Sequence, residues 1–143
     1  LHANSSNQAI DRIINFFPEN MREQLLMDLS LNLRAMISQR LVPLKEGKGR
    51  AAAIEVMLNS PLIADHIFKG NIGEIKDVMK RSRELGMQTF DQALFDLYEA
   101  GRINYEDALR NADSVNDLRL QIKLNSKEAQ DRNLNVTSGL DLV

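Results

Sequence analysis

Apolar residues recur at helical spacing along most of the chain, in short segments separated by glycine, proline or a capping residue. The clearest segment, LGMQTFDQALFDLYEAG, runs from Leu85 to Gly101. Thr89 is followed three residues later by Gln92, which is the pattern of a capping box at a helix N-terminus. Glycines bound the helix, since glycine adopts the left-handed conformation common where helices end. One apolar stripe follows the cap: Phe90, Ala93, Leu94, Leu97 and Tyr98. The pattern predicts a central helix against which neighbouring helices pack.

Two helices are expected in the N-terminal third. Asn4, Ser5 or Ser6 can cap the first helix. Pro18 ends it, because the residue before a proline is pushed out of the α region. The second helix is the longest expected, over about residues 19–38, with apolar side chains four residues apart: Leu25, Leu29, Leu33 and Ile37. This stripe is wide enough to be buried on two sides.

Shorter helices are expected further along the chain. Ser60 followed by Pro61 is a typical helix start, and Gly70 is the expected stop. Capping residues predict three more helix starts, at Asn71, Asn104 and Ser114. Residues 125–143 are polar with no sustained period, so we expect a loose tail there.

The segment from Arg50 to Asn59 is ambiguous from its pattern. Its three alanines favour a helix, whereas its apolar residues alternate as in a strand. We interpret it as half of a hairpin, with strands at about 40–44 and 50–58 joined by the polar turn KEGKGR. That turn does not match a phosphate-binding loop, which needs two glycines with four residues between them and then Lys and Ser or Thr. The fold expected is mainly α, with a small β-hairpin followed by a helical bundle.

Composition narrows the possible functions. The chain has 143 residues, which suits one domain or one and a half small ones, and a net charge of −2 with only 5% aromatic residues. These values argue against nucleic-acid binding, including through the basic helix at residues 76–83. The absence of cysteine excludes disulfides and thiolate chemistry and is compatible with a reducing cytoplasm. No apolar run is long enough to span a membrane, and no signal peptide is visible. Because the chain begins at Leu1 rather than Met, we interpret it as a piece of something longer.

Few side chains suggest chemistry by themselves. His2 lies near a chain end, where a histidine most often has no role. His66 lies on the apolar side of its expected helix and is best interpreted as a histidine at the rim of the core with a local hydrogen bond. Lys80, Arg81 and Arg83 are typical of a solvated helix face. Asp107 and Asp117 are explained as first-turn residues. The residues alone indicate no complete catalytic site.

Several segments carry a family resemblance. LHANSSNQAIDRIINFFP at the start resembles the histidine-box end and following helix of the secretion and type IV pilus ATPases. SLNLRAMISQRLVP and GRAAAIEVMLNSPLIADHI continue the likeness. Residues 81–124, which contain LGMQTFDQAL, resemble the C-terminal helical part of the twitching-motility ATPases of the PilT and PilU family, with greater similarity to PilU-type members. The resemblance covers nearly all of residues 1–124 and does not cover the tail.

The resemblance implies a hexameric, cytoplasmic ATPase at the inner-membrane face of the pilus machine, which uses ATP and Mg²⁺ to drive pilus retraction. It implies that residues 1–58 are the C-terminal end of a RecA-like ATPase core, residues 59–124 a helical subdomain and residues 125–143 a tail. Its expected partners are further copies of itself, the pilus inner-membrane platform and a related retraction ATPase, without nucleic acid and without membrane insertion. It raises His2, which matches the second histidine of the histidine box, to the best catalytic candidate. Arg50 matches the arginine of a Gly-Arg segment and is a weaker nucleotide-binding candidate.

Departures from the family pattern limit what this chain can do. The phosphate-binding loop, the acidic Asp-box and the Walker B segment would all precede Leu1, so we expect this chain alone neither to hold nucleotide tightly nor to hydrolyse ATP. The motif AIRNLIRE of the PilT pattern is replaced by LIADHIFK at residues 62–69. The four-cysteine metal loop of filament-assembling relatives is absent, and no metal is expected. The alternative is a non-enzymatic helical interaction module related to the family.

Overall fold

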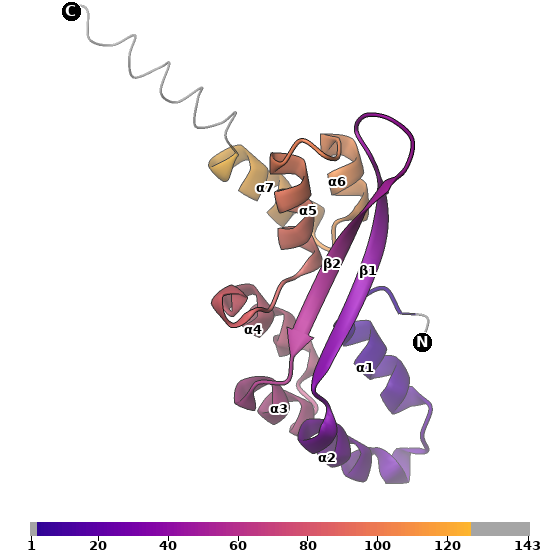
Figure 1. Ribbon diagram of the computed structural model, residues 1–143. Helices are drawn as coiled ribbons and strands as arrows, with labels where there is room; N and C mark the ends of the chain where they lie inside the picture. The colour runs from indigo at the N-terminus through magenta and orange to yellow at the C-terminus, as the bar shows by residue number, and fades with distance from the viewer. Residues whose placement is uncertain (1–2, 127–143) are drawn as a thin grey trace, which may run out of the picture.

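The structure is a computed structural model that describes residues 3–126 (Figure 1). The helices are α1 (Ser6–Asn15), α2 (Arg22–Asn32), α3 (Pro61–Phe68), α4 (Ile75–Arg81), α5 (Phe90–Glu99), α6 (Tyr105–Asn111) and α7 (Val115–Asn125). The strands are β1 (Ala35–Pro43) and β2 (Arg50–Leu58). Short 3₁₀ turns at Glu19–Met21, Ile72–Glu74 and Arg83–Leu85 lead into or out of helices. The expectation of a mainly helical chain with a small hairpin is confirmed.

Helices pack against both ends of the β-hairpin that β1 and β2 form. Its strands pair antiparallel in a register that runs from Ala35 opposite Leu58 to Pro43 opposite Arg50. Figure 1 shows helices α1–α3 around one end of this long ribbon and α5–α7 beside the other. The free edge of β2 is used once, where Val56 and Gln88 exchange two backbone hydrogen bonds of 2.8 and 2.9 Å. Over residues 3–126 no further strand pairs with β1.

Two apolar clusters hold the helices to this ribbon. The first lies between α1–α4 and the adjacent end of the hairpin, and its buried members are Ile10, Ile14, Leu26, Met57, Ile63, Ile67, Ile72, Ile75, Val78, Met79 and Met87. The second lies between α5–α7 and the opposite end, and its buried members are Val42, Ala51, Ala53, Phe90, Ala93, Leu94, Ile103, Ala108, Leu118 and Ile122. The first cluster includes residues on both sides of position 58, and a domain boundary there stays a prediction.

The capping chemistry explains where several helices start. Thr89 forms the full capping box with Gln92, as the sequence predicts. Ser5, Ser60 and Ser114 each accept a hydrogen bond from the backbone N–H three residues on, at Gln8, Ile63 and Asp117. Gly86 and Gly101 adopt positive φ angles of 93° and 68°, the left-handed conformation expected of them.

Several expected element boundaries and caps are wrong. The second helix ends at Asn32 rather than near Ser38, and β1 takes over residues 35–43 instead of about 40–44. Pairing with β2 overrides the four-residue apolar spacing, since every residue from Ala35 to Pro43 has a partner in the register. Asn71 leads into a 3₁₀ turn rather than directly into a helix. Asn104 does stand at the start of α6, but neither asparagine makes a side-chain capping hydrogen bond. The predicted tail lies mostly outside the described residues, but Asn125 still belongs to α7.

One face of the hairpin is apolar and exposed. Ile37 and Leu41 of β1 are 71% and 50% exposed. The register places Val56 opposite Ile37 and Ala52 opposite Leu41, so these side chains share the face. The opposite face carries Val42, Ala51 and Ala53, which are buried against the helices. The ribbon therefore packs against helices on one side only.

Candidate functional site

The two site residues expected from the sequence are not brought together by the described structure. His2 lies outside the described residues. Arg50 is the first residue of β2, exposed, and opposite Pro43 at the turn end of the hairpin. The segment before it is a hairpin turn in which Gly47 and Gly49 have φ angles of 81° and 133°. In residues 3–126 no ion pair involves the guanidinium of Arg50.

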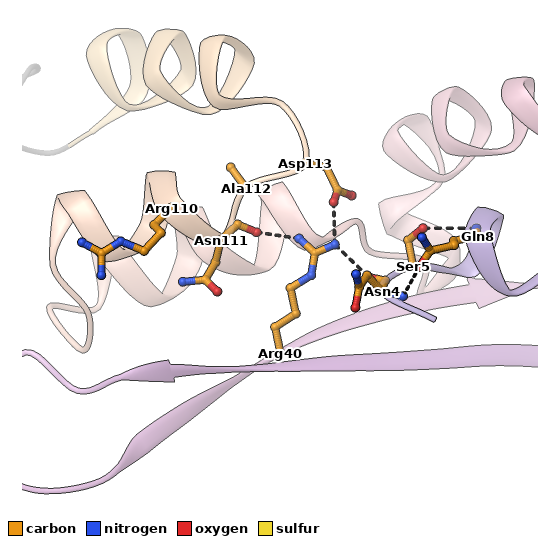
Figure 2. A pocket seen from close by; sticks show the side chains of 8 residues that line it. All are labelled: Asn4, Ser5, Gln8, Arg40, Arg110, Asn111, Ala112 and Asp113. Carbon is orange, nitrogen blue, oxygen red and sulfur yellow. Dashed lines mark hydrogen bonds and ion pairs between the residues drawn. The ribbon is translucent and has the colours of Figure 1, made fainter. Parts of the chain in front are cut away.

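The best-formed polar site centres instead on Arg40 of β1, which the sequence analysis did not single out. Its partners lie 36 to 73 residues away in sequence, so no local pattern indicates it. The site borders an open hollow of about 550 Å³, lined by Asn4, Ser5, Gln8, Arg40, Arg110, Asn111, Ala112 and Asp113 (Figure 2). Figure 2 shows the Arg40 side chain standing between the segment before α1 and the loop between α6 and α7.

The Arg40 guanidinium makes three hydrogen bonds through its two terminal nitrogens. Nη1 donates to the carbonyl oxygen of Asn111 at 2.5 Å. Nη2 donates to the carbonyl oxygen of Asn4 at 2.7 Å and to Oδ1 of Asp113 at 2.6 Å. The guanidinium carbon lies 3.9 Å from the centre of the buried Phe90 ring, a cation–π contact. The side chain is 19% exposed, so these contacts form in a partly desolvated place.

Two aspartates organise the loop that Arg40 meets. Asp113 pairs with Arg40 through one carboxylate oxygen and with Lys76 of α4 through the other. Burial acts to raise the pKa of Asp113, but the hydrogen bonds and charges of Lys76 and Arg40 outweigh it and hold that pKa below its usual range. Asp91, on α5, accepts hydrogen bonds from the backbone N–H groups of Asp113 and Ser114 at 2.8 and 3.1 Å. Burial nevertheless raises the pKa of Asp91, and those two hydrogen bonds oppose the rise.

A second contact fixes the start of α1. Glu55 of β2 is fully buried, and its Oε1 accepts a hydrogen bond from the backbone N–H of Ser6 at 2.7 Å. Its other oxygen, the Ser6 hydroxyl and the Asn7 side-chain oxygen are buried without a hydrogen-bond partner. A fully buried carboxylate on a strand is rare, and the alternation of apolar residues along β2 gives no sign that Glu55 faces the helices.

The chemistry available to these residues is limited. The guanidinium of Arg40 is paired with Asp113 and donates to two backbone carbonyl oxygens, so the site holds chain segments in place rather than presenting an unpaired cation. The described residues contain no group of three or more side chains able to hold a metal ion. His66 is half-buried as expected, but its Nδ1 is buried without a partner, so the expected local hydrogen bond at that nitrogen is not formed.

The basic residues at 80–83 lie on the surface, and two of them form ion pairs. Lys80 pairs with Asp117 at 3.4 Å, and Arg83 pairs with Asp96. Asp107 and Asp117 lie in the first turns of α6 and α7, as expected. No helix of the described part of the chain combines the length and apolar character needed to cross a lipid bilayer.

Sequence comparison finds relatives that are named as type IV pilus ATPases or as a twitching motility protein. The chain is 60% identical to the type IV pilus ATPase PilU of Pseudomonas aeruginosa over 142 residues, 99% of this chain and 37% of that protein. It is 35% identical to the type IV pilus retraction ATPase PilT of the same species over 78% of the chain, and 36% identical to a twitching motility protein of Neisseria gonorrhoeae over the same share. The chain spans about a third of the length of these relatives. No family model matches it.

Solved structures agree with the sequence relatives. The fold matches the crystal structure of the pilus retraction motor PilT with bound ADP at a TM-score of 0.73 and 34% identity, over 83% of this chain and 33% of that one. The ATPase DotB of Legionella pneumophila matches at a TM-score of 0.61 and 20% identity, over 76% of this chain and 29% of that one, which indicates a shared fold alone. The matched region of PilT is its C-terminal part.

Proposed function

We propose that this chain, which is homologous over nearly its whole length to part of the type IV pilus ATPases PilU and PilT, is the C-terminal portion of an ATPase that powers pilus retraction. The observation that carries the proposal is the 60% identity to PilU over 142 residues, together with the fold match to PilT. The whole protein is a hexamer in the cytoplasm at the inner-membrane face of the pilus machine. It works beside a related retraction ATPase and the inner-membrane platform.

The apolar outer face of the hairpin supports a role within a larger protein. A two-stranded ribbon is marginal by itself, and this one exposes Ile37, Leu41 and the unpaired edge of β1. The relatives are about two and a half times as long as this chain. The remaining part of a protein of that length would cover such a face.

Nucleotide chemistry belongs to the whole protein and not to this chain alone. Phosphoryl transfer needs a phosphate cradle and Mg²⁺, and the 143 residues contain no GxxxxGK[ST] segment. In the whole protein His2 assists at the nucleotide, and Arg50 faces either the nucleotide or a neighbouring subunit. The exposure of Arg50 at the turn end of the hairpin is compatible with a contact to another subunit.

A hydrolysis assay tests the proposal. The full-length protein should release phosphate from Mg-ATP, and a His2→Ala variant should do so more slowly. The 143-residue chain should release none. A full-length protein with no hydrolysis under conditions in which PilT is active would support the alternative, a non-enzymatic helical interaction module.

A further inference from the structure

Arg40 and Glu55 hold the same short segment of chain. The register places Glu55 opposite Ser38 and Arg40 opposite Ala53, so both side chains extend from the helix-covered face of the hairpin. Arg40 donates to the carbonyl oxygen of Asn4, and Glu55 accepts from the backbone N–H of Ser6, each at 2.7 Å. Residues 4–6 are therefore fixed on the hairpin by one strand at each end.

Arg40 also reaches the opposite wall of the hollow. Its contacts to the Asn111 carbonyl and the Asp113 carboxylate fix the end of α6 and the loop of residues 112–114 that leads to α7. That loop is in turn bound by Asp91 and Lys76. Within the described chain no hydrogen bond joins Asp113 directly to residues 4–6. A shift of the loop would nevertheless move the guanidinium of Arg40, which also donates to the carbonyl oxygen of Asn4.

We propose that Arg40 is a positioning residue, which couples the α6–α7 loop to residues 4–6, the segment that follows His2 in the sequence. The assignment of a catalytic effect rests on the proposed function, because His2 stands two residues before Asn4 in the sequence. The coupling itself rests on contacts of this chain. Arginine suits the task, since its rigid planar fork holds several acceptors in a fixed geometry, whereas the ammonium of lysine is a compact charge on a flexible stem.

The coupling can be measured without nucleotide. In the 143-residue chain, backbone amide resonances of Ser5 and Ser6 should move in an Asp113→Asn variant, although Asp113 has no hydrogen bond to them. In an Arg40→Gln background the same Asp113→Asn change should leave those two resonances in place. Resonances that stay unmoved in the Asp113→Asn variant, or that move equally in both backgrounds, would overturn the coupling.

The catalytic effect is measured in the full-length protein. Arg40→Gln should lower kcat for ATP about tenfold to a hundredfold, because small misplacements at a reacting site have effects of that size. KM for ATP should stay within about twofold, since Arg40 does not belong to the phosphate cradle. Arg40→Lys should restore part of kcat.

A matched control separates positioning from loss of fold. Lys80→Gln removes a surface ion pair near the same loop, with Asp117, and should leave kcat unchanged. Arg40 variants with an unchanged melting temperature and wild-type kcat would overturn the catalytic effect. A wild-type full-length protein without any ATPase activity would instead contradict the proposed function, while the resonance measurement would still decide the coupling.

Discussion

Leu94 is fully buried on α5, at the centre of the second apolar cluster. Replacing it with alanine removes contacts that the surrounding helices cannot fully recover, so the free energy of unfolding should fall by about 2–5 kcal/mol. Urea denaturation measures this change. Leu120→Ala on α7 is the matched control, because that side chain is 56% exposed and its loss should change stability by about 0.5 kcal/mol or less. Equal effects of the two changes would remove α5 from the centre of the fold.

The ion pairs of Asp113 should make the stability of the chain depend on pH. The pKa of Asp113 is lowered in the folded chain, so it contributes stability that is present above the unfolded value of about 4 and lost as pH falls through the lower folded value. The urea midpoint of the wild-type chain should therefore drop below about pH 4. In an Asp113→Asn variant that part of the drop should be missing. Asp65→Asn, at an exposed ion pair with Lys69, serves as the control and should retain the wild-type pH profile.

At the scale of the helix, Thr89 and Asn104 form a matched pair. Thr89 makes a full capping box, whereas Asn104 precedes α6 without a side-chain capping hydrogen bond. Thr89→Ala should lower the free energy of unfolding by about 1 kcal/mol, the usual cost of losing such a cap. Asn104→Ala should change it much less. Similar losses for both variants would show that the capping hydrogen bonds do not decide the difference.

The elements differ in how far the sequence predicts them. The sequence correctly predicts the start of α3 at Ser60 and Pro61, the capping box of Thr89 and Gln92, and the bounds of β2. The signals for these features are local. The helix expected to reach Ser38 fails, since pairing of residues 35–43 with β2 is a long-range effect that overrides helical spacing. The sequence pattern does not indicate Arg40 for the same reason, because its partner Asp113 lies 73 residues away.

At the scale of the whole molecule, the exposed apolar face of the hairpin leads us to expect different effects of one substitution in the 143-residue chain and in the full-length protein. Ile37→Lys should change the stability of the 143-residue chain by about 0.5 kcal/mol or less, because Ile37 is 71% exposed. In the full-length protein the same change should lower stability, since a charge would then meet a covering surface. Denaturation of both proteins measures this difference. Val42→Lys is the control on the same strand: Val42 is fully buried, so both proteins should be strongly destabilised.

The central claim is that these residues form a helical lobe of a retraction ATPase whose phosphate chemistry lies elsewhere in the whole protein. Calorimetric titration with Mg-ATP tests it most directly, with the 143-residue chain and the full-length protein measured side by side. We predict binding heat from the full-length protein and none from the chain alone. Micromolar binding of Mg-ATP by the chain alone would contradict the account.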